Sequence, residues 1–252
     1  MLSRRVIVCL DVHGGRVVKG VQFKALRDIG DPVVLAQAYE RAGADEIVLL
    51  DISASVEERN TLLDVVRRTA ENLFIPLTVG GGIRSVADIA TVLRAGADKV
   101  GINSAAVESV QLLTDAADRF GAQCVVASID AKRDGDRWRV YTRGGSRPTG
   151  LDVVEWAEQC THHGAGEILL TSIDRDGSAL GYDIELTRRV TDHVRVPVVA
   201  SGGAGNVGDV VAVIRDGNAD AALVAGMVHD GHCTVADLKA GMSDAGLSVR
   251  AA

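Results

Sequence analysis

Aromatic residues are scarce in this sequence. Only 3% of its 252 residues are Phe, Trp or Tyr, although 47% are hydrophobic. The core must therefore be built from Val, Ile, Leu and Ala, which are the side chains that fill parallel barrels. The length is typical of one such barrel and is sufficient to bury a substantial core.

An excess of positive charge is also missing. The formal net charge is −7 and the isoelectric point is near 5.4. Surfaces that bind nucleic acid need clustered Lys and Arg, so we expect no nucleic-acid partner. A small anionic ligand is still compatible with this balance, because backbone amides and a few cations can hold it locally.

Patterns for metal binding and membrane insertion are lacking as well. The four cysteines form no C-x-x-C pair, and neither they nor the six histidines have the spacing of metal ligands, so we expect no metal, no cofactor and reduced thiols in the cytoplasm. The N-terminal apolar run Val6–Leu10 is too short for a signal peptide and ends at Asp11. No stretch approaches the length of a membrane span.

Short apolar runs alternate with longer helix-like segments along the whole chain. The runs are continuously hydrophobic, which is typical of strands covered on both faces. Repeated strand–helix units in a chain of this length predict the α/β class and a closed (β/α)8 TIM barrel in one domain, residues 1–252. The alternative is an open doubly wound sheet, and the number of repeats argues against it. The eight runs are 5–11, 46–51, 74–80, 97–103, 123–130, 167–172, 196–201 and 219–226, and helix candidates between them include 32–43, 61–72, 86–96 and 151–164.

The two halves of the sequence resemble each other. GAD-EIVLLD (43–51) matches GAG-EILLTS (164–172), and VGGGI onward (79–105) matches ASGGAG onward (200–227), with offsets of 121 to 122. This predicts half-barrels of about 1–120 and 121–252, with equivalent groups on opposite sides of the mouth. Two insertions, 12–31 and 132–149, follow strands at the catalytic end and are candidate lids; in the second, residues 133–136 and 138–142 predict a hairpin turn and its second arm.

Polar and glycine residues gather at the predicted strand ends, where barrel enzymes carry their active sites. Asp11 and Asp130 end equivalent strands, so we predict that they divide acid and base roles. Glycine-rich turns after the third and seventh strands predict two phosphate sites, because backbone amides can approach an anion closely there. Candidate binding residues are Lys19, Asp51, Gly82, Asn103, Ser104, Thr171, Ser172, Asp176, Gly177, Ser201, Gly202, Gly203, Ala225 and Gly226.

Charged residues stand at the beginnings of four predicted strands: Arg5, Glu46, Lys99 and Glu167. Alternating signs are compatible with a salt-bridged plug at the bottom of the barrel. Spacing alone, however, favours ordinary solvated strand starts.

Several motifs together resemble one family over most of the chain, from Arg5 to about His229. The family is the cyclase subunit of imidazole glycerol phosphate synthase, an enzyme of histidine biosynthesis. The motifs that carry the resemblance are CLDVHGGRVVKG (9–20), LLDISAS (49–55), TVGGGI (78–83), INSAAV (102–107), SIDAKR (128–133), EILLTSIDRDGS (167–178) and ASGGAG (200–205).

The resemblance implies a lyase that acts on a bisphosphate, the phosphoribulosyl-formimino derivative of aminoimidazole carboxamide ribonucleotide. Ammonia would come through the barrel from a glutaminase subunit docked at the N-terminal face, near Asp98 and Lys99. Under the resemblance Asp11 and Asp130 are the acid/base pair, and Lys19 belongs to the first loop. One phosphate site comprises Gly82, Asn103 and Ser104, the other comprises Asp176, Gly177, Gly203, Ala225 and Gly226, and the ammonia gate comprises Arg5, Glu46, Lys99 and Glu167.

One departure from the family is Gly226, where the family often has a serine that contacts phosphate. Two alternatives also remain. The sister isomerase of the pathway is a similar two-half barrel that needs no ammonia, but LLDISAS, the Lys19 loop and the gate residues favour the cyclase. A non-catalytic phosphate-binding docking barrel is the other, and the Asp11–Asp130 pair argues against it.

Overall fold

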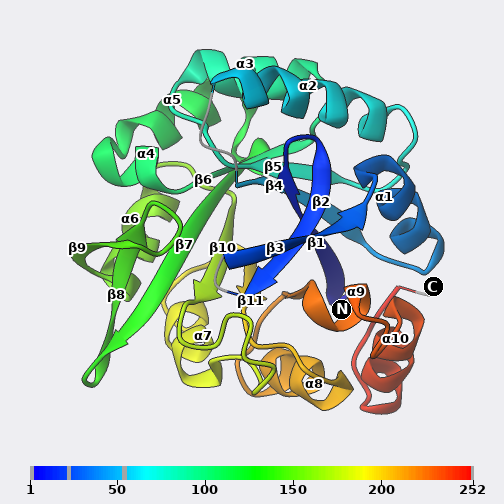
Figure 1. The fold of residues 1–252 in the computed structure, drawn as a ribbon. Helices are drawn as coiled ribbons and strands as arrows, with labels where there is room; N and C mark the ends of the chain where they lie inside the picture. Colours follow the sequence, from blue (N-terminus) through cyan, green and yellow to red (C-terminus); the bar gives the residue numbers. More distant parts are fainter. Residues whose placement is uncertain (1–2, 22–23, 53–55, 251–252) are drawn as a thin grey trace.

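A closed barrel of parallel strands forms the centre of the molecule (Figure 1). The computed structural model describes residues 3–21, 24–52 and 56–250. Within these residues, eight parallel strands pair in the ring order β1-β4-β5-β6-β7-β10-β11-β12, and β12 pairs with β1 to close it. The barrel strands are β1 (Arg5–His13), β4 (Glu46–Asp51), β5 (Leu77–Gly80), β6 (Lys99–Ile102), β7 (Val125–Asp134), β10 (Glu167–Ser172), β11 (Val198–Ser201) and β12 (Ala221–Val224). The predicted TIM barrel is confirmed.

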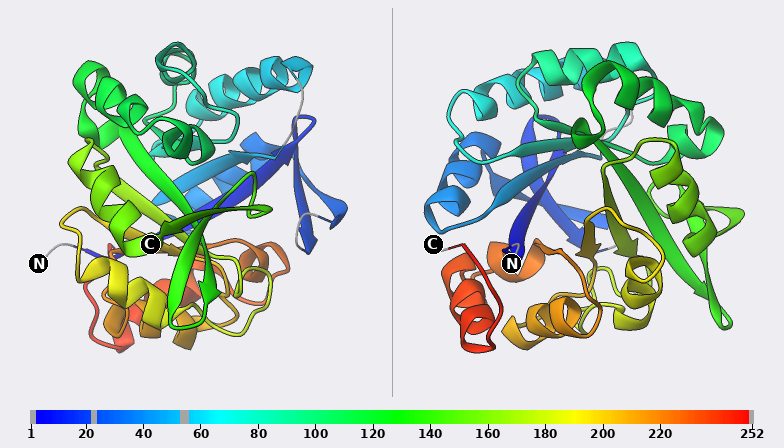
Figure 2. Two further views of the ribbon diagram at one scale, coloured as in Figure 1. Left: turned by 90° about the vertical axis from the view of Figure 1, so that its left-hand side faces the viewer. Right: turned by 180° about the vertical axis from the view of Figure 1, so that it is seen from behind.

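Helices surround the strands on the outside, as both views in Figure 2 show. Many begin at a side chain that caps the first turn: Asp31, Ser85, Asp152, Asp183, Asn206 and Thr234 each accept a hydrogen bond from a backbone amide two or three residues later. The helices are α1 (Pro32–Arg41), α2 (Val56–Ala70), α3 (Val86–Arg94), α4 (Ser104–Glu108), α5 (Gln111–Phe120), α6 (Val153–His162), α7 (Ile184–Thr191), α8 (Val207–Arg215), α9 (Gly226–His229) and α10 (Val235–Asp244), with a 3₁₀ turn η1 (Ala122–Cys124). Among the described residues, no helix has the length and apolar character needed to cross a bilayer.

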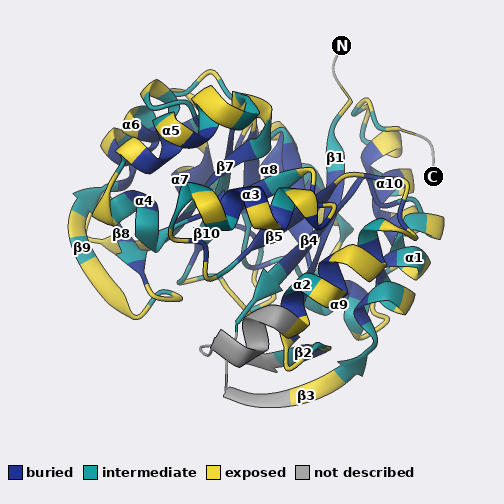
Figure 3. Ribbon diagram, turned by 90° about the horizontal axis from the view of Figure 1, so that it is seen from above, coloured by how far each residue is buried: buried dark blue, intermediate teal, exposed yellow. Residues whose placement is uncertain are grey.

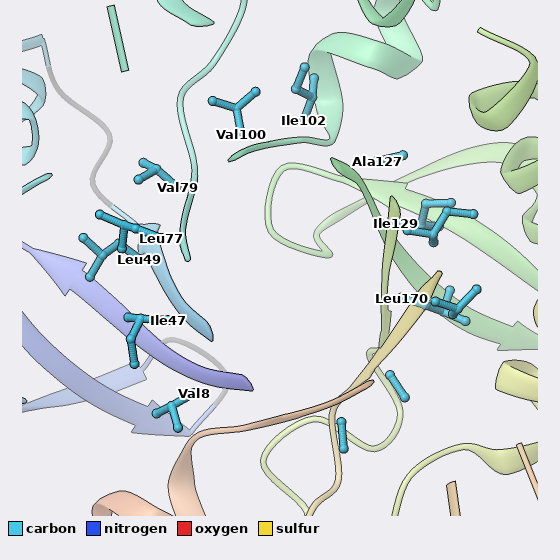
Figure 4. Close-up of a cluster of buried hydrophobic side chains, with 14 of the residues drawn as sticks. Val8, Ile47, Leu49, Leu77, Val79, Val100, Ile102, Ala127, Ile129 and Leu170 are labelled. Carbon is cyan, nitrogen blue, oxygen red and sulfur yellow. The ribbon is translucent and has the colours of Figure 1, made fainter. Parts of the chain in front are cut away.

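Alternate residues of each strand enter two different apolar layers, which explains the continuous hydrophobic runs. On β1, Val6, Val8 and Leu10 face the helices and belong to the large outer core. Ile7 and Cys9 face the barrel interior and belong to a smaller inner cluster. Figure 4 shows the outward-facing side chains around the ring. Burial of each such aliphatic side chain stabilises the folded state by about 1.5–3 kcal/mol. Because the period is two residues, Arg5 and Asp11 lie in the same inward row, at opposite ends of β1.

Three aspartates each connect the starts of two neighbouring strands through a hydrogen bond. Asp45 accepts from the amide of Val6 at 2.8 Å, Asp98 from Leu77 at 2.8 Å, and Asp220 from Val198 at 3.0 Å. The equivalent position before β10 is Gly166, where an added Cβ would lie 2.3 Å from the carbonyl oxygen of Ala122. The close approach of η1 therefore requires glycine there.

The two insertions are antiparallel strands added to the barrel. In the first, β1 continues to His13 and turns through Gly14 and Gly15 into β2 (Arg16–Val21), which pairs with β3 (Lys24–Gly30). This hairpin was not predicted. In the second, β8 (Arg137–Thr142) confirms the predicted second arm, while the third strand, β9 (Arg147–Asp152), was missed. In Figure 3, much of β3 is exposed or not described.

The elements of the second half follow those of the first at nearly constant spacing. β4 and β10 begin 121 residues apart, as do α3 and α8, while β6 and β12 begin 122 residues apart. The first and last described segments lie side by side, because the amide of Arg4 donates to the carbonyl oxygen of Ser248 at 2.7 Å. Ring order places β1 and β7 directly across the barrel from each other, four strands apart in either direction.

Candidate active site

Asp11 and Asp130 lie at the mouth of the barrel, on β1 and β7. The alternation of the strands turns both side chains inward, in the same rows as Cys9 and Ser128. The two carboxyl groups therefore face a shared space from opposite strands, as the sequence predicted.

Burial, together with the nearby carboxylate of Asp176, raises the pKa of Asp11 to about 6, although a hydrogen bond from Cys9 opposes the rise. The Cys9 thiol lies 3.6 Å from Oδ1 of Asp11, so this buried cysteine contacts the site in addition to packing. A carboxyl group with such a pKa exchanges protons readily near neutral pH.

Asp130 has a similar environment. Its pKa is raised to about 6, mainly by burial; a hydrogen bond from Asn103 opposes the rise, and the carboxylate of Asp176 adds to it. Nδ2 of Asn103 donates to Oδ2 of Asp130 at 2.9 Å, whereas Oδ1 of Asn103 is buried without a hydrogen-bond partner among the described residues. Asn103 thus orients one carboxyl group and keeps an acceptor available for a ligand donor.

Asp176 links the two carboxyl groups electrostatically. Burial raises its own pKa, and the amide of Gly177 opposes this rise. Since Asp176 raises the pKa of both Asp11 and Asp130, a full set of three negative charges at the mouth is unfavourable. At least one of these carboxyl groups is protonated at moderately acidic pH, which is the condition for divided acid and base roles.

A cavity of about 280 Å³ opens beside Asp11 between the ends of β11 and β12. Gly203 has φ 105°, and an added Cβ would lie 2.3 Å from the carbonyl oxygen of Gly181, so only glycine allows this close loop packing. The predicted residues that line the cavity are Asp11, Lys19, Asp176, Gly177, Ser201, Gly202, Gly203, Ala225 and Gly226. The structure thus brings together the residues predicted for the phosphate site of the seventh and eighth strands.

The residues predicted for the other phosphate site do not line this cavity. Gly82 has φ 66° and open space where a Cβ would lie, and Asn103 contacts Asp130. Ser104 accepts a hydrogen bond from the amide of Arg143, in the turn between β8 and β9, at 3.0 Å. The second insertion therefore reaches the end of β6, close to the predicted site.

The remaining predicted binding residues have other surroundings. Thr171 is in register with Asp130 on the adjacent strand. Ser172 is buried, and its hydroxyl donates to Asp183 at 3.5 Å. Asp51 ends β4, and the last part of its motif, residues 53–55, lies outside the described residues.

Sequence reasoning missed His229, Tyr39 and Asp230. His229 lines the cavity; its Nε2 donates to the carbonyl oxygen of Cys9 at 3.0 Å, so its Nδ1 accepts from the Tyr39 hydroxyl at 2.7 Å. Burial lowers the pKa of His229, which favours this neutral form. No local pattern reveals these contacts, because the partners are about two hundred residues apart.

Arg5, Glu46, Lys99 and Glu167, here called the charge ring, close the opposite end of the barrel. Arg5 contacts Glu46 at 3.0 Å and also pairs with Glu167, while Lys99 contacts Glu46 at 2.8 Å and Glu167 at 2.7 Å. Both glutamates are buried, and the hydroxyl of Thr78 donates to Glu46 at 2.6 Å. Spacing alone favoured solvated strand starts, and this interpretation was wrong because barrel closure directs all four side chains inward.

Asp11→Asn is expected to stabilise the fold at pH 7 by about 1–3 kcal/mol and to have little effect near pH 4. The folded pKa of Asp11, about 6, exceeds the ordinary value of 3.8. The stability that Asp11 contributes is therefore fully present below pH 3.8 and is lost as pH rises through 6. Urea unfolding at several pH values measures the difference between variant and wild type. The matched control is Asp134→Asn at the exposed end of β7. If the stability difference between Asp11→Asn and wild type were as constant with pH as that of the control, the expectation would be contradicted.

The fold and the mouth together define a (β/α)8 barrel protein with a carboxyl-lined, glycine-rich ligand site. A family model described as "Histidine biosynthesis protein" matches residues 5–234. The chain therefore belongs to the histidine biosynthesis family, and its relatives are HisF subunits of imidazole glycerol phosphate synthase.

Three relatives with the name "Imidazole glycerol phosphate synthase subunit HisF" illustrate the similarity. The protein of Myxococcus xanthus is 66% identical, and that of Dehalococcoides mccartyi 56%, each over 99% of both chains. The protein of Thermosynechococcus vestitus is 57% identical over 95% of this chain and 87% of its own.

Proposed function

We propose that the protein is the cyclase subunit of imidazole glycerol phosphate synthase, a lyase of histidine biosynthesis that works in the cytoplasm. It uses ammonia to convert the phosphoribulosyl-formimino derivative of aminoimidazole carboxamide ribonucleotide into imidazole glycerol phosphate and aminoimidazole carboxamide ribonucleotide. The observation that carries the mechanism is the pair of inward carboxyl groups, Asp11 and Asp130, each with a pKa of about 6. The HisF name of the relatives favours this activity over that of the sister isomerase.

In this mechanism Asp11 and Asp130 act from opposite sides of the reacting carbon. Ammonia attacks the ribulosyl carbonyl, the ionised carboxylate accepts a proton from the attacking nitrogen, and the protonated carboxyl donates one to the departing oxygen. The carbonyl oxygen leaves as water. The new nitrogen then attacks the formimino carbon and closes the imidazole ring, while the bond from that carbon to the amine of aminoimidazole carboxamide ribonucleotide breaks and the amine takes up a proton. Asn103 orients Asp130 during these transfers, since it donates to Oδ2 at 2.9 Å.

The two phosphates of the substrate bind at the two ends of the mouth. The cavity beside Gly203 and Gly226, with Lys19 at its edge, takes one phosphate. Gly82, Asn103 and Ser104, with Asp51, Thr171 and Ser172 nearby on the ring, serve the other end. β6 begins 22 residues after the start of β5, and β12 begins 23 residues after the start of β11; this nearly equal spacing supports two equivalent sites.

A glutaminase subunit is the partner, and it docks at the N-terminal face around the charge ring. The relatives are named as subunits, which supports a complex. Below the mouth, the inner rows are mainly apolar and include Ile7, Val48 and Leu223 beside the smaller Cys9 and Ala221, so the interior contacts a small neutral molecule more favourably than an ion.

The direct test supplies the purified chain with the bisphosphate and ammonium at alkaline pH. Product must form only when ammonium, or glutamine with the glutaminase subunit, is present. Rearrangement of the isomeric phosphoribosyl-formimino compound into this bisphosphate without a nitrogen source would identify an isomerase, and binding of the bisphosphate without turnover would identify a docking barrel.

Lys99→Met is expected to lower glutamine-dependent turnover about tenfold, about 1.4 kcal/mol, and to leave ammonium-dependent turnover unchanged. Lys99 pairs with both glutamates of the charge ring, whereas external ammonia reaches the mouth directly. Both steady-state rates should be measured with one enzyme preparation. Arg188→Met on α7 is the control, since among the described residues Arg188 forms an exposed ion pair with Asp192, far from the charge ring in sequence. An equal loss in the two assays would assign the charge ring a purely structural role.

A further inference from the structure

Asp230, directly after α9, joins both arms of the β2–β3 hairpin to the barrel. Its Oδ2 pairs with Nζ of Lys19 on β2, and its Oδ1 accepts from Arg27 on β3 at 2.9 Å. Lys19 and Arg27 face each other in the register of the hairpin. One carboxylate, with 26% of its side chain exposed, thus gathers two cations at the edge of the cavity.

The cavity needs a fixed cation. Its described lining contains three carboxyl groups, of Asp11, Asp176 and Asp230, and Lys19 is the one Lys or Arg among them. The ammonium group of Lys19, when it is close, adds the attraction of a full positive charge to that of the backbone amides for a phosphate dianion in this cavity. A free lysine side chain loses much rotamer entropy when it is immobilised, so anchoring it in advance favours binding.

Gly226 leaves the space that Lys19 occupies. Nζ of Lys19 lies 3.4 Å from the carbonyl oxygen of Gly226, and a Cβ added at residue 226 would lie 3.1 Å from Nζ and 3.3 Å from Cε. Any larger residue at this position displaces the lysine by a few tenths of an ångström. Gly226 and Asp230 together therefore define where the ammonium group lies.

We propose that Asp230 is the positioning residue that holds Lys19 beside the cavity, ready for one phosphate of the substrate. This inference rests on the proposed function and adds a residue to its binding site. Two cations share the single carboxylate, so the cluster of Lys19, Arg27 and Asp230 keeps a net positive charge toward an entering anion. The carboxylate therefore orients Lys19 without cancelling the attraction.

Asp230→Ala is the variant that tests the proposal. We expect the KM for the bisphosphate to rise about tenfold and kcat to stay within about twofold, because the phosphate keeps its charge throughout the reaction. Asp230→Glu should restore KM to within about threefold of the wild-type value, since it returns the carboxylate. In a Lys19→Met background, Asp230→Ala should change KM no further, because its effect passes through Lys19.

The matched control is Asp28→Asn. Asp28 lies on the same hairpin and pairs with Arg16, but it does not line the cavity. The KM of the Asp28→Asn variant for the bisphosphate should therefore equal that of the wild type. An unchanged or lower KM in Asp230→Ala would overturn the proposal, because Asp230 would then only repel the substrate. A rise in KM when Asp230→Ala is added to Lys19→Met would also overturn the proposal.

A titration with inorganic phosphate separates this proposal from the proposed function. Isothermal calorimetry should give a weaker phosphate affinity for Asp230→Ala than for the wild type and Asp28→Asn. Equal affinities would contradict the role of Asp230. Wild-type chain that binds phosphate in this Asp230-dependent manner but never turns over the bisphosphate would refute only the cyclase assignment.

Discussion

Asp11→Asn and Asp130→Asn are each expected to lower ammonium-dependent kcat by a factor of about 10²–10⁴. Asparagine keeps the shape of the side chain and its hydrogen-bond acceptor, but it neither donates an acidic proton nor accepts one. Each carboxyl has a pKa of about 6, which suits proton transfer near neutral pH. Steady-state kinetics with saturating ammonium and bisphosphate measures the loss.

The double variant should lose little more than the worse single variant, because the two groups serve the same transfers. Asp134→Asn, an exposed change further along β7, is the control and should retain full activity. Wild-type turnover in either single variant would remove that aspartate from the chemistry.

Lys239→Met is expected to lower the free energy of unfolding by about 3–5 kcal/mol. Lys239 on α10 and Asp45 before β4 form a buried ion pair at 2.7 Å, with 4% and 6% of their side chains exposed. Removal of the ammonium leaves the Asp45 carboxylate buried, and among the described residues the amide of Val6 is then its remaining hydrogen-bond donor. Urea denaturation of full-length chain measures the change.

Two further variants make this measurement specific. Arg188→Met breaks an exposed ion pair with Asp192 and should lower the free energy of unfolding by no more than about 0.5 kcal/mol. Adding Asp45→Asn to Lys239→Met should recover part of the loss, because the uncompensated charge disappears while an acceptor for Val6 remains. A loss below about 1 kcal/mol in Lys239→Met would show that the site admits water.

The barrel was predictable because its physical signal is local and repeated. Each strand is hydrophobic on two faces, and each strand–helix unit repeats the same pattern, so runs such as 46–51 and 167–172 indicate strands by themselves. The polar ends of these strands also identified the mouth, since parallel strands in a barrel end on one side. Asp11 and Asp130 followed from these two facts.

Contacts between distant segments were not predictable in the same way. The charge ring depends on the stagger of a closed barrel, which brings Arg5 within hydrogen-bonding distance of Glu167, 162 residues later. The pair of Lys19 and Asp230 depends on how an unpredicted hairpin folds toward α9, 211 residues away. A helix-periodic or alternating pattern contains no information on such pairings.

The hairpin and the third strand of the second insertion were missed for a different reason. Gly14 and Gly15 provide the positive φ angles of a tight turn, but glycine is equally common in irregular loops. Extension of β1 and β7 beyond the barrel rim allowed both insertions to continue the sheet. Sheet pairing at the rim decided their structure.

The aspartates at the strand starts have a consequence for the order of assembly. Asp45, Asp98 and Asp220 each connect the two strands of one β–α–β unit, across 39, 21 and 22 residues. Contacts between segments this close in sequence cost little chain entropy. Each of these three units can therefore form its connecting hydrogen bond before the barrel closes. The unit of β7 and β10 has Gly166 where the other three have the aspartate, so it lacks this connecting hydrogen bond. We expect this unit to be the last of the four to become rigid as the polypeptide folds.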